Sequence, residues 1–204
     1  MSKVFAIGLS KTGTTSLHTA LKRLGYSSVH FPISMHEIDS HDAAVNLPVA
    51  CRFEELDKLY PNSKFILTTR DIGKWLQSCK PQYEVDPQME KSISFKDLTE
   101  INSFFFNLRM KVFGTKYYDS DLFRKAYYEH LDRVNHYFTD RPQDLLVMNI
   151  PGGNGWNQLC NFLKCPVPEE PFPFENSHRK LVSNLNQDIA ARLLATHPKN
   201  WLSY

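Results

Sequence analysis

The segment Gly8-Leu-Ser-Lys-Thr-Gly-Thr-Thr-Ser16 has the residue types and the spacing of an anion-binding loop. It follows the short apolar run 3–9, and it precedes a segment whose leucines and alanines recur at helical spacing up to Gly25. A glycine-containing loop between a strand and a helix directs several backbone N–H groups and the positive end of the helix dipole at one point. Because Lys11 adds a cation there, the sequence predicts a site for a negatively charged ligand.

The loop also has the glycine spacing of the phosphate-binding loop of nucleotide hydrolases, GxxxxGK[ST]. Gly8 and Gly13 match that spacing, but Thr14 stands where the motif has its lysine, and the cation is Lys11 instead. The chain also has no apolar strand that ends in a lone carboxylate suited to magnesium. An ATP or GTP kinase or hydrolase with a degenerate loop is therefore the weaker interpretation, and no metal is expected.

A second candidate anion site combines Arg70 with Ser78. The apolar run 64–69 predicts a strand that ends at Arg70, and a helix is expected from Asp71, a good N-cap residue, to about Cys79. Ser78 lies about two turns into that helix, so it projects from nearly the same face as the helix start. A guanidinium group and a hydroxyl group can therefore converge on one phosphate.

Together these residues resemble the sulfotransferases that use 3′-phosphoadenosine 5′-phosphosulfate (PAPS). Lys11-Thr-Gly-Thr-Thr15 is similar to the Lys-x-Gly-Thr-Thr loop of that family, and Arg70 followed by Ser78 is similar to its second signature. The resemblance implies that Lys11 is a catalytic residue that contacts the phosphosulfate and supports the leaving group, and that Arg70 and Ser78 hold the 3′ phosphate. It implies that the 5′ phosphate is held by Thr12, Gly13, Thr14, Thr15 and Ser16. Many members have a tryptophan near the adenine where this chain has Ser16.

Transfer to a hydroxyl group usually needs a general base, and histidine is the commonest one at neutral pH. His30 is the first candidate, because it ends a predicted second strand, 28–31, in parallel register with the loop that carries Lys11. His41 beside Asp42 is the second candidate, and Glu54 or Glu55 would replace a histidine base.

The elements that position these residues alternate between strands and helices, which predicts an α/β fold with a central parallel sheet, helices on both faces and a P-loop nucleotide-binding-like topology. Further helices are expected at 53–60, in two parts of 97–138 separated near Gly114, and at 156–163, with a strand at 145–150. A mobile loop is expected at 80–96, and aromatic residues from Trp75 to Tyr118 are more consistent with a core than with an acceptor pocket.

The C-terminal part, 165–204, is expected to form an extended proline-rich arm followed by a terminal helix over 186–195. A looser resemblance to one branch of sulfotransferase-like proteins covers 146–176. Arg179-Lys180 could supply further basic residues to the nucleotide, or they could form an exposed surface pair. The whole chain, 1–204, is expected to be a single domain.

Composition limits the alternatives. With 204 residues, 42% of them hydrophobic, the chain can bury one core, and a formal net charge of +2 disfavours a general nucleic-acid binder. We expect no membrane span, no leader segment and a cytoplasmic location. The four cysteines have no zinc-site spacing and are expected to be reduced and buried.

The sequence therefore predicts a sulfotransferase that moves a sulfuryl group from PAPS to a small-molecule or saccharide acceptor and releases 3′-phosphoadenosine 5′-phosphate (PAP). Three alternatives stay open: the kinase or hydrolase named above, a sulfotransferase-like protein that binds PAP without catalysis, and a scaffold without activity.

Overall fold

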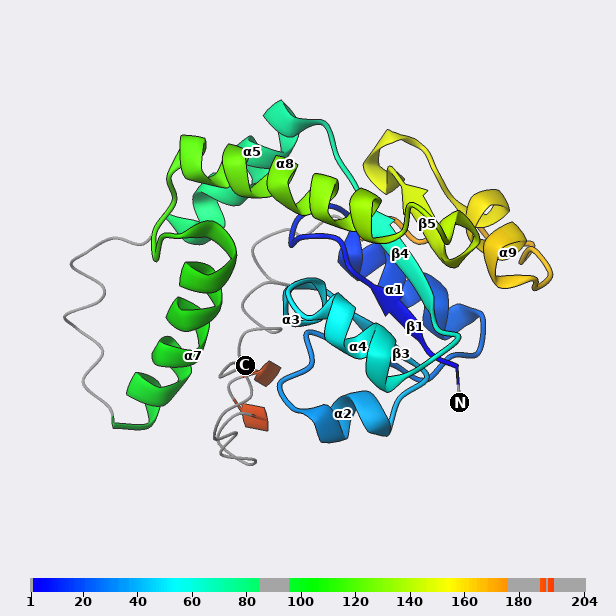
Figure 1. The fold of residues 1–204 in the computed structure, drawn as a ribbon, viewed down its shortest axis with the longest axis horizontal. Coiled ribbons are helices and arrows are strands. Elements are labelled where there is room, and N and C mark those ends of the chain that lie inside the picture. The colour runs from blue at the N-terminus through cyan, green and yellow to red at the C-terminus, as the bar shows by residue number, and fades with distance from the viewer. Residues whose placement is uncertain (1, 85–95, 176–187, 190, 193–204) are drawn as a thin grey trace.

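The strand that precedes the predicted loop lies in the middle of a parallel sheet (Figure 1). The computed structural model describes residues 2–84, 96–175, 188–189 and 191–192, and within them the sheet has five strands in the order β2-β3-β1-β4-β5. The strands are β1 (Val4–Ala6), β2 (Ser28–His30), β3 (Ala43–Val45), β4 (Lys64–Thr68) and β5 (Leu145–Met148). All paired strands are parallel, so their carboxyl ends share one edge, and the loop after β1 opens at its centre.

Helices α1 (Thr14–Arg23) and α9 (Trp156–Leu163) cover one face of the sheet. Side chains alternate along a strand, so Val4 and Ala6 both point to this face. They pack in one buried cluster with Leu17 and Leu21 of α1 and with Leu159 of α9. The helical spacing of the leucines in α1 is thus explained by burial against β1.

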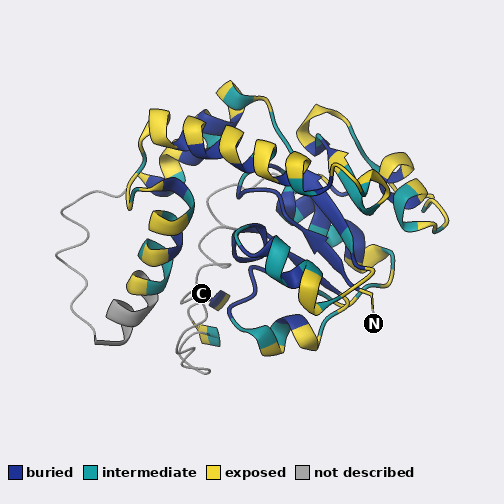
Figure 2. Ribbon diagram, in the orientation of Figure 1, coloured by how far each residue is buried: buried dark blue, intermediate teal, exposed yellow. Residues whose placement is uncertain are grey.

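The opposite face is covered by α2 (Met35–Asp39), α3 (Leu47–Ala50), α4 (Phe53–Leu59) and the second half of α8 (Ser120–Tyr137). Phe5 of β1 and Phe65 of β4 point to this face and pack with Phe53, Val134 and Phe138. Helices on both faces of a parallel sheet confirm the predicted three-layer α/β architecture, and Figure 2 shows the buried strands between the half-exposed helices.

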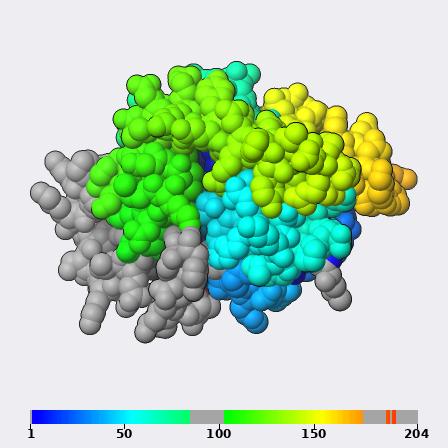
Figure 3. Space-filling view, in the orientation of Figure 1, coloured from blue at the N-terminus to red at the C-terminus, as the bar shows by residue number. Residues whose placement is uncertain are grey.

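A third buried cluster lies beyond the carboxyl edge of the sheet, formed by α5 (Ile72–Tyr83), α7 (Lys96–Phe113) and the first half of α8. Leu9, Phe31 and Leu47, which follow β1, β2 and β3, pack into it with the fully buried Trp75. This cluster gives the carboxyl edge a helical wall. In the space-filling view, dark blue atoms of the N-terminal segment are visible in a small hollow between α7 and α8 (Figure 3).

Residues 165–175 form neither helix nor strand and lie across α1 and α9. Trp156 Nε1 donates a hydrogen bond to the Glu170 carbonyl at 2.7 Å, and the Glu175 amide donates to Ser16 Oγ at 2.9 Å. Two short 3-10 turns, η1 (Pro142–Asp144) and η2 (Ile150–Gly152), flank β5. Within the expected terminal helix 186–195, residues 188–189 and 191–192 are helical, and the others lie outside the described residues.

Two features differ from the sequence expectations. Strand β3 was not expected, because Ala43–Val45 is only three residues long and lies between the turn-prone residues Asp42 and Asn46. Helix α5 continues past Cys79 to Tyr83 and contains Pro81, which has no N–H group for the helical hydrogen bond to the carbonyl four residues earlier. Of the loop expected at 80–96, residues 85–95 lie outside the described part of the chain, as does Arg179-Lys180.

The predicted break near Gly114 is confirmed, since α7 ends at Phe113 and α8 begins at Ser120.

The described helices include none that is both long and apolar enough to cross a membrane. All four cysteines lie in the described part and none forms a disulfide. Burial raises the pKa of Cys79 to about 12, so this thiol stays protonated at neutral pH.

Gly8 is required by the close approach of β1 and β4. A Cβ atom at residue 8 would lie 1.8 Å from Thr68 Oγ1, 2.6 Å from the Thr68 carbonyl oxygen and 2.8 Å from Thr12 Oγ1. We therefore expect Gly8→Ala to lower the free energy of unfolding by about 3 kcal/mol and the melting temperature by about 6–12 °C.

Gly73→Ala in α5 is the matched control, because its Cβ would meet only Asp71 Oδ1, at 3.4 Å. Calorimetry should show a change of at most about 1 kcal/mol for this control, in the stabilising direction. Equal melting temperatures for the two variants would contradict the packing argument.

Candidate functional site

The loop after β1 presents backbone N–H groups toward a single point. Lys11 and Gly13 both have positive φ angles, 72° and 105°, which reverse the direction of successive peptide groups. Helix α1 then begins at Thr14 with Gly13 as its N-cap, and glycine has no side chain that could accept a hydrogen bond from the first turn. The first N–H groups of a helix have no intrahelical partner, so this arrangement suits an anion.

Several carbonyl groups in and just before this loop accept hydrogen bonds from side chains. Three of the donors come from other elements: His130 Nε2 at Ile7 (2.7 Å), Trp75 Nε1 at Ser10 (2.9 Å) and Arg70 Nη1 at Lys11 (3.1 Å). Within the loop itself, Thr12 Oγ1 donates to the Leu9 carbonyl at 2.6 Å. These carbonyl groups therefore have their donors inside the protein.

Arg70 joins the two predicted anion sites. Its Nη1 contacts the Lys11 carbonyl, while its own backbone exchanges two hydrogen bonds with the hydroxyl of Tyr127 on α8, at 3.0 and 2.7 Å. Arg70 Nε is buried and has no hydrogen-bond partner among the described residues. Burial and the nearby Arg70 charge lower the pKa of Lys11, opposed in part by Cys79. An anion between these two cations would relieve both their repulsion and their desolvation.

Ser78 lies half-buried on α5, two turns from the helix start. Asp71 caps this helix as predicted, since its carboxylate accepts a hydrogen bond from the Lys74 amide at 2.9 Å. Arg70 and Ser78 are therefore presented by the strand end and the helix that the sequence predicts. Their contact with a 3′ phosphate stays a prediction.

His30 is buried at the carboxyl end of β2, but β3 separates it from β1. Its Nε2 lies 3.2 Å from Asn46 Nδ2, and the side chain of Asn46 also accepts a hydrogen bond from Ser10 Oγ at 2.8 Å. The ring is thus connected to the anion loop through Asn46. Burial, together with the neighbouring His18 and Arg192, lowers the pKa of His30 to about 3.

The other base candidates are less well placed. His41 lies just before β3, at the amino ends of the strands and opposite the loop, with Nδ1 2.7 Å from the Glu37 carbonyl. Glu54 is paired with Arg133 at 3.2 Å, and Glu55 accepts two hydrogen bonds from Arg52.

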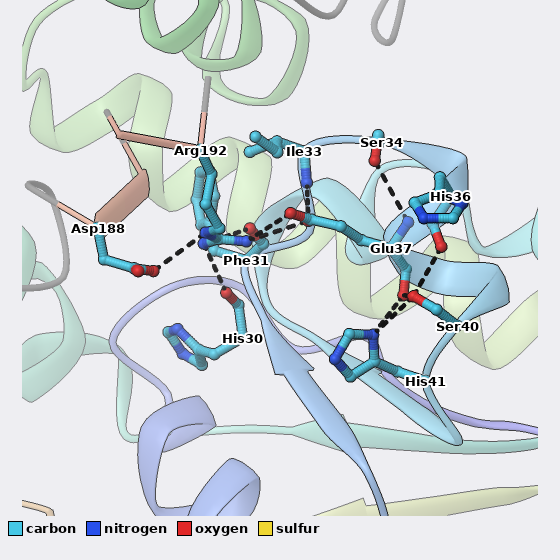
Figure 4. Close-up of polar contacts among 10 residues, drawn as sticks. All are labelled: His30, Phe31, Ile33, Ser34, His36, Glu37, Ser40, His41, Asp188 and Arg192. Carbon is cyan, nitrogen blue, oxygen red and sulfur yellow. Dashed lines mark hydrogen bonds and ion pairs between the residues drawn. The ribbon is translucent and has the colours of Figure 1, made fainter. Parts of the chain in front are cut away.

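A helical turn near the C-terminus contacts the end of β2 (Figure 4). Arg192 Nη1 lies 3.0 Å from both carboxylate oxygens of Glu37, and Arg192 Nη2 donates to the carbonyls of His30 and Phe31 at 3.4 Å each. The Glu37 carboxylate also accepts a hydrogen bond from the Ile33 amide at 2.8 Å. The turn that follows His30 is therefore fixed by an ion pair between distant parts of the chain.

Sequence reasoning missed the residues that hold the predicted ones in place: Asn46, Trp75 in its hydrogen-bonding role, Tyr127, His130 and Arg192. Asn46 had a usable signal, because Ala-Ala-Val-Asn-Leu-Pro is an apolar run that ends in a polar residue. Among the residues that the structure describes, no group of three histidine, cysteine or acidic side chains is arranged to hold a metal ion.

Comparison with known proteins places this chain in a family. The family profile described as "Sulfotransferase domain" matches residues 3–41 and 35–181. "Ava biosynthesis cluster protein M" of Aspergillus versicolor is 28% identical over 215 residues, which cover 84% of this chain and 79% of that protein. The crystal structure of a sulfotransferase from Alicyclobacillus acidocaldarius is 14% identical, with a TM-score of 0.49 over 98% of each chain. Because the profile match includes β1, the anion loop, β4 and α9, the chain belongs to the sulfotransferase domain family.

Proposed function

We propose that this protein transfers a sulfuryl group from PAPS to a hydroxyl group or an amine of a small-molecule or saccharide acceptor. The observation that carries the proposal is the contact of Arg70 Nη1 with the Lys11 carbonyl at 3.1 Å, because it brings the two predicted anion sites to one edge of the sheet. PAPS differs from ATP in bearing a 3′ phosphate, so two cationic sites on one nucleotide favour PAPS.

The residues present fit the nucleotide. Lys11 and the N–H groups of the loop would hold the 5′ phosphosulfate, and Arg70 with Ser78 would hold the 3′ phosphate. Arg70 Nε supports this assignment, because a buried N–H group of a guanidinium is costly without an acceptor. Bound PAPS supplies the transferable sulfuryl group and a phosphate leaving group.

The transferred group carries one negative charge, so fixed cations and amides can stabilise the transition state. Lys11 would stabilise the charge that develops on the leaving phosphate oxygen. Its lowered pKa reflects a desolvated site, in which such a charge interaction is stronger than in water. Helices α5, α7 and α8 form a buried apolar cluster beside this edge, which would limit the access of water to the transfer step.

The nucleotide preference can be measured by thermal shift with PAP, AMP and ATP, each with and without magnesium. At a PAP concentration of 100 times Kd we expect stabilisation of about 2.7 kcal/mol, or about 5–10 °C. Arg70→Ala should weaken PAP binding about 10- to 100-fold and AMP binding less, because AMP has no 3′ phosphate and loses only the support that Arg70 gives to the Lys11 carbonyl. Lys11→Ala should weaken both.

Lys58→Ala is the matched control, because it removes the same charge from an exposed position on α4. A preference for magnesium ATP would overturn the proposal in favour of a kinase or hydrolase. PAP binding without conversion of PAPS to PAP, in the presence of a panel of phenols, alcohols and amines, would overturn the transfer step.

The pH dependence of PAP binding tests the assignment of Lys11 by itself. Since burial lowers its pKa, free Lys11 loses its proton at a pH below the ordinary value of 10.5. The phosphosulfate site needs the charged form, so PAP affinity should fall as the pH rises through this lowered pKa. In Lys11→Arg the charge persists, and calorimetric titration should show a flat affinity over the same range. A flat profile for the wild-type protein would remove Lys11 from the site.

A further inference from the structure

Asn46 has a backbone conformation that is rare for any residue except glycine. Its φ and ψ angles are 93° and −172°, at the carboxyl end of β3 and next to the anion loop. Strained backbone of this kind persists only where the surroundings fix it, and it concentrates at functional sites. Phe31, directly after β2, and Lys11, in the loop after β1, also have positive φ angles, 58° and 72°. The segments that follow three neighbouring strands thus each contain a residue with a positive φ angle.

The hydrogen bonds of Asn46 determine which way its amide group faces. The Leu47 amide lies 2.7 Å from Asn46 Oδ1, and a backbone N–H can only donate. The oxygen of the side chain must therefore face Leu47, where it also accepts from Ser10 Oγ at 2.8 Å. The NH₂ group is left facing His30 Nε2, at 3.2 Å.

An NH₂ group can only donate, so His30 Nε2 must accept and cannot carry a proton. In the neutral ring the proton is then on Nδ1. This atom is buried and has no hydrogen-bond partner among the described residues, so the ring holds one unused N–H donor. The one basic lone pair of the neutral ring, on Nε2, is therefore occupied by the Asn46 NH₂ group and is unavailable to a substrate.

We propose that Asn46 is a positioning residue that holds His30 as the Nδ1–H tautomer, so that His30 does not accept the proton of an acceptor group in sulfuryl transfer. This inference rests on the proposed function for the identity of the reaction. It replaces the general-base role that the sequence predicts for His30.

The charged and titratable groups around His30 favour the neutral ring. His18 of α1 lies with its ring centroid 5.5 Å from that of His30. Arg192 donates to the His30 carbonyl and is itself paired with Glu37 of α2 and Asp188 of its own turn. Neutral imidazole is also favoured by burial, and the pKa of about 3 is consistent with this environment.

The tautomer can be read directly from ring nitrogen chemical shifts in long-range ¹H–¹⁵N spectra of the full chain. The wild-type protein should show a protonated Nδ1 and an unprotonated Nε2 for His30, with no titration between pH 5 and 8. His30→Gln assigns the signals by their loss. A protonated Nε2, or a titration near the ordinary pKa of 6.5, would overturn the proposal.

Two substitutions of Asn46 distinguish positioning from simple packing. In Asn46→Asp a carboxylate faces Nε2 and can only accept, so the proton should move to Nε2 and the pKa of His30 should rise by about 1–3 units. Asn46→Gly adopts the same backbone without strain and folds, but it removes the amide, so both tautomers should appear. An unchanged Nδ1–H signal in both variants would show that Asn46 does not set the tautomer.

The rate of PAPS conversion to PAP gives a second readout. The wild-type profile should lack a limb from His30 between pH 4 and 8, and Asn46→Asp should gain one between about pH 4 and 6. His30→Gln, which keeps an N–H group but has no basic ring nitrogen, should retain activity, whereas a base role would make this variant inactive. The spectra need neither PAPS nor turnover, so a failed tautomer assignment and a failed sulfotransferase assignment give separate results.

Discussion

The site depends on how the loop after β1 satisfies its backbone hydrogen bonds. A buried carbonyl without a donor is costly, and a buried N–H group is equally costly without an acceptor. Here the carbonyls of Ile7, Ser10 and Lys11 take donors from α8, α5 and the end of β4, so their cost is met inside the protein. The N–H groups on the other side are left for a ligand. The backbone of the loop can therefore bind an anion even without the charges of Lys11 and Arg70. The side chains that donate to its carbonyl groups come from three elements distant in sequence.

Burial at this edge of the sheet also disfavours the charged forms of its ionisable groups. Burial lowers the pKa of His130 to about 4, and its Nε2 donates to the Ile7 carbonyl. Lys11 carries a desolvated charge beside Arg70. Such groups reduce the stability of the free protein, and a nucleotide with two anionic groups would return part of that free energy on binding. The three apolar clusters thus stabilise the fold, whereas the desolvated groups at the carboxyl edge of the sheet lower its stability.

Much of the fold and half of the site could be predicted because their signals are local. The strand, loop and helix around Lys11, and the strand and helix around Arg70, lie within short segments whose residue types indicate their structure. Strand β3 could not be predicted in this way: Ala43–Val45 forms a strand because β1 and β2 pair with it on both sides, which no local pattern records. Because β3 was not predicted, Asn46 at its end was not recognised. For the same reason β2 was expected beside β1, which would place His30 one strand closer to the loop than it is.

The role of His30 shows the limit of residue type as evidence. A histidine at the end of a parallel strand is a sound candidate base, but a base needs a free lone pair, and that depends on one amide group. Asn46 and aspartate differ little in size, yet the amide nitrogen directs the proton to Nδ1, whereas a carboxylate would direct it to Nε2. The strained backbone of Asn46 fixes the choice, since the side-chain oxygen is held by Leu47 and Ser10 and the amide cannot turn over. Reaction chemistry at this edge is therefore set by the partner of the histidine as much as by the histidine itself.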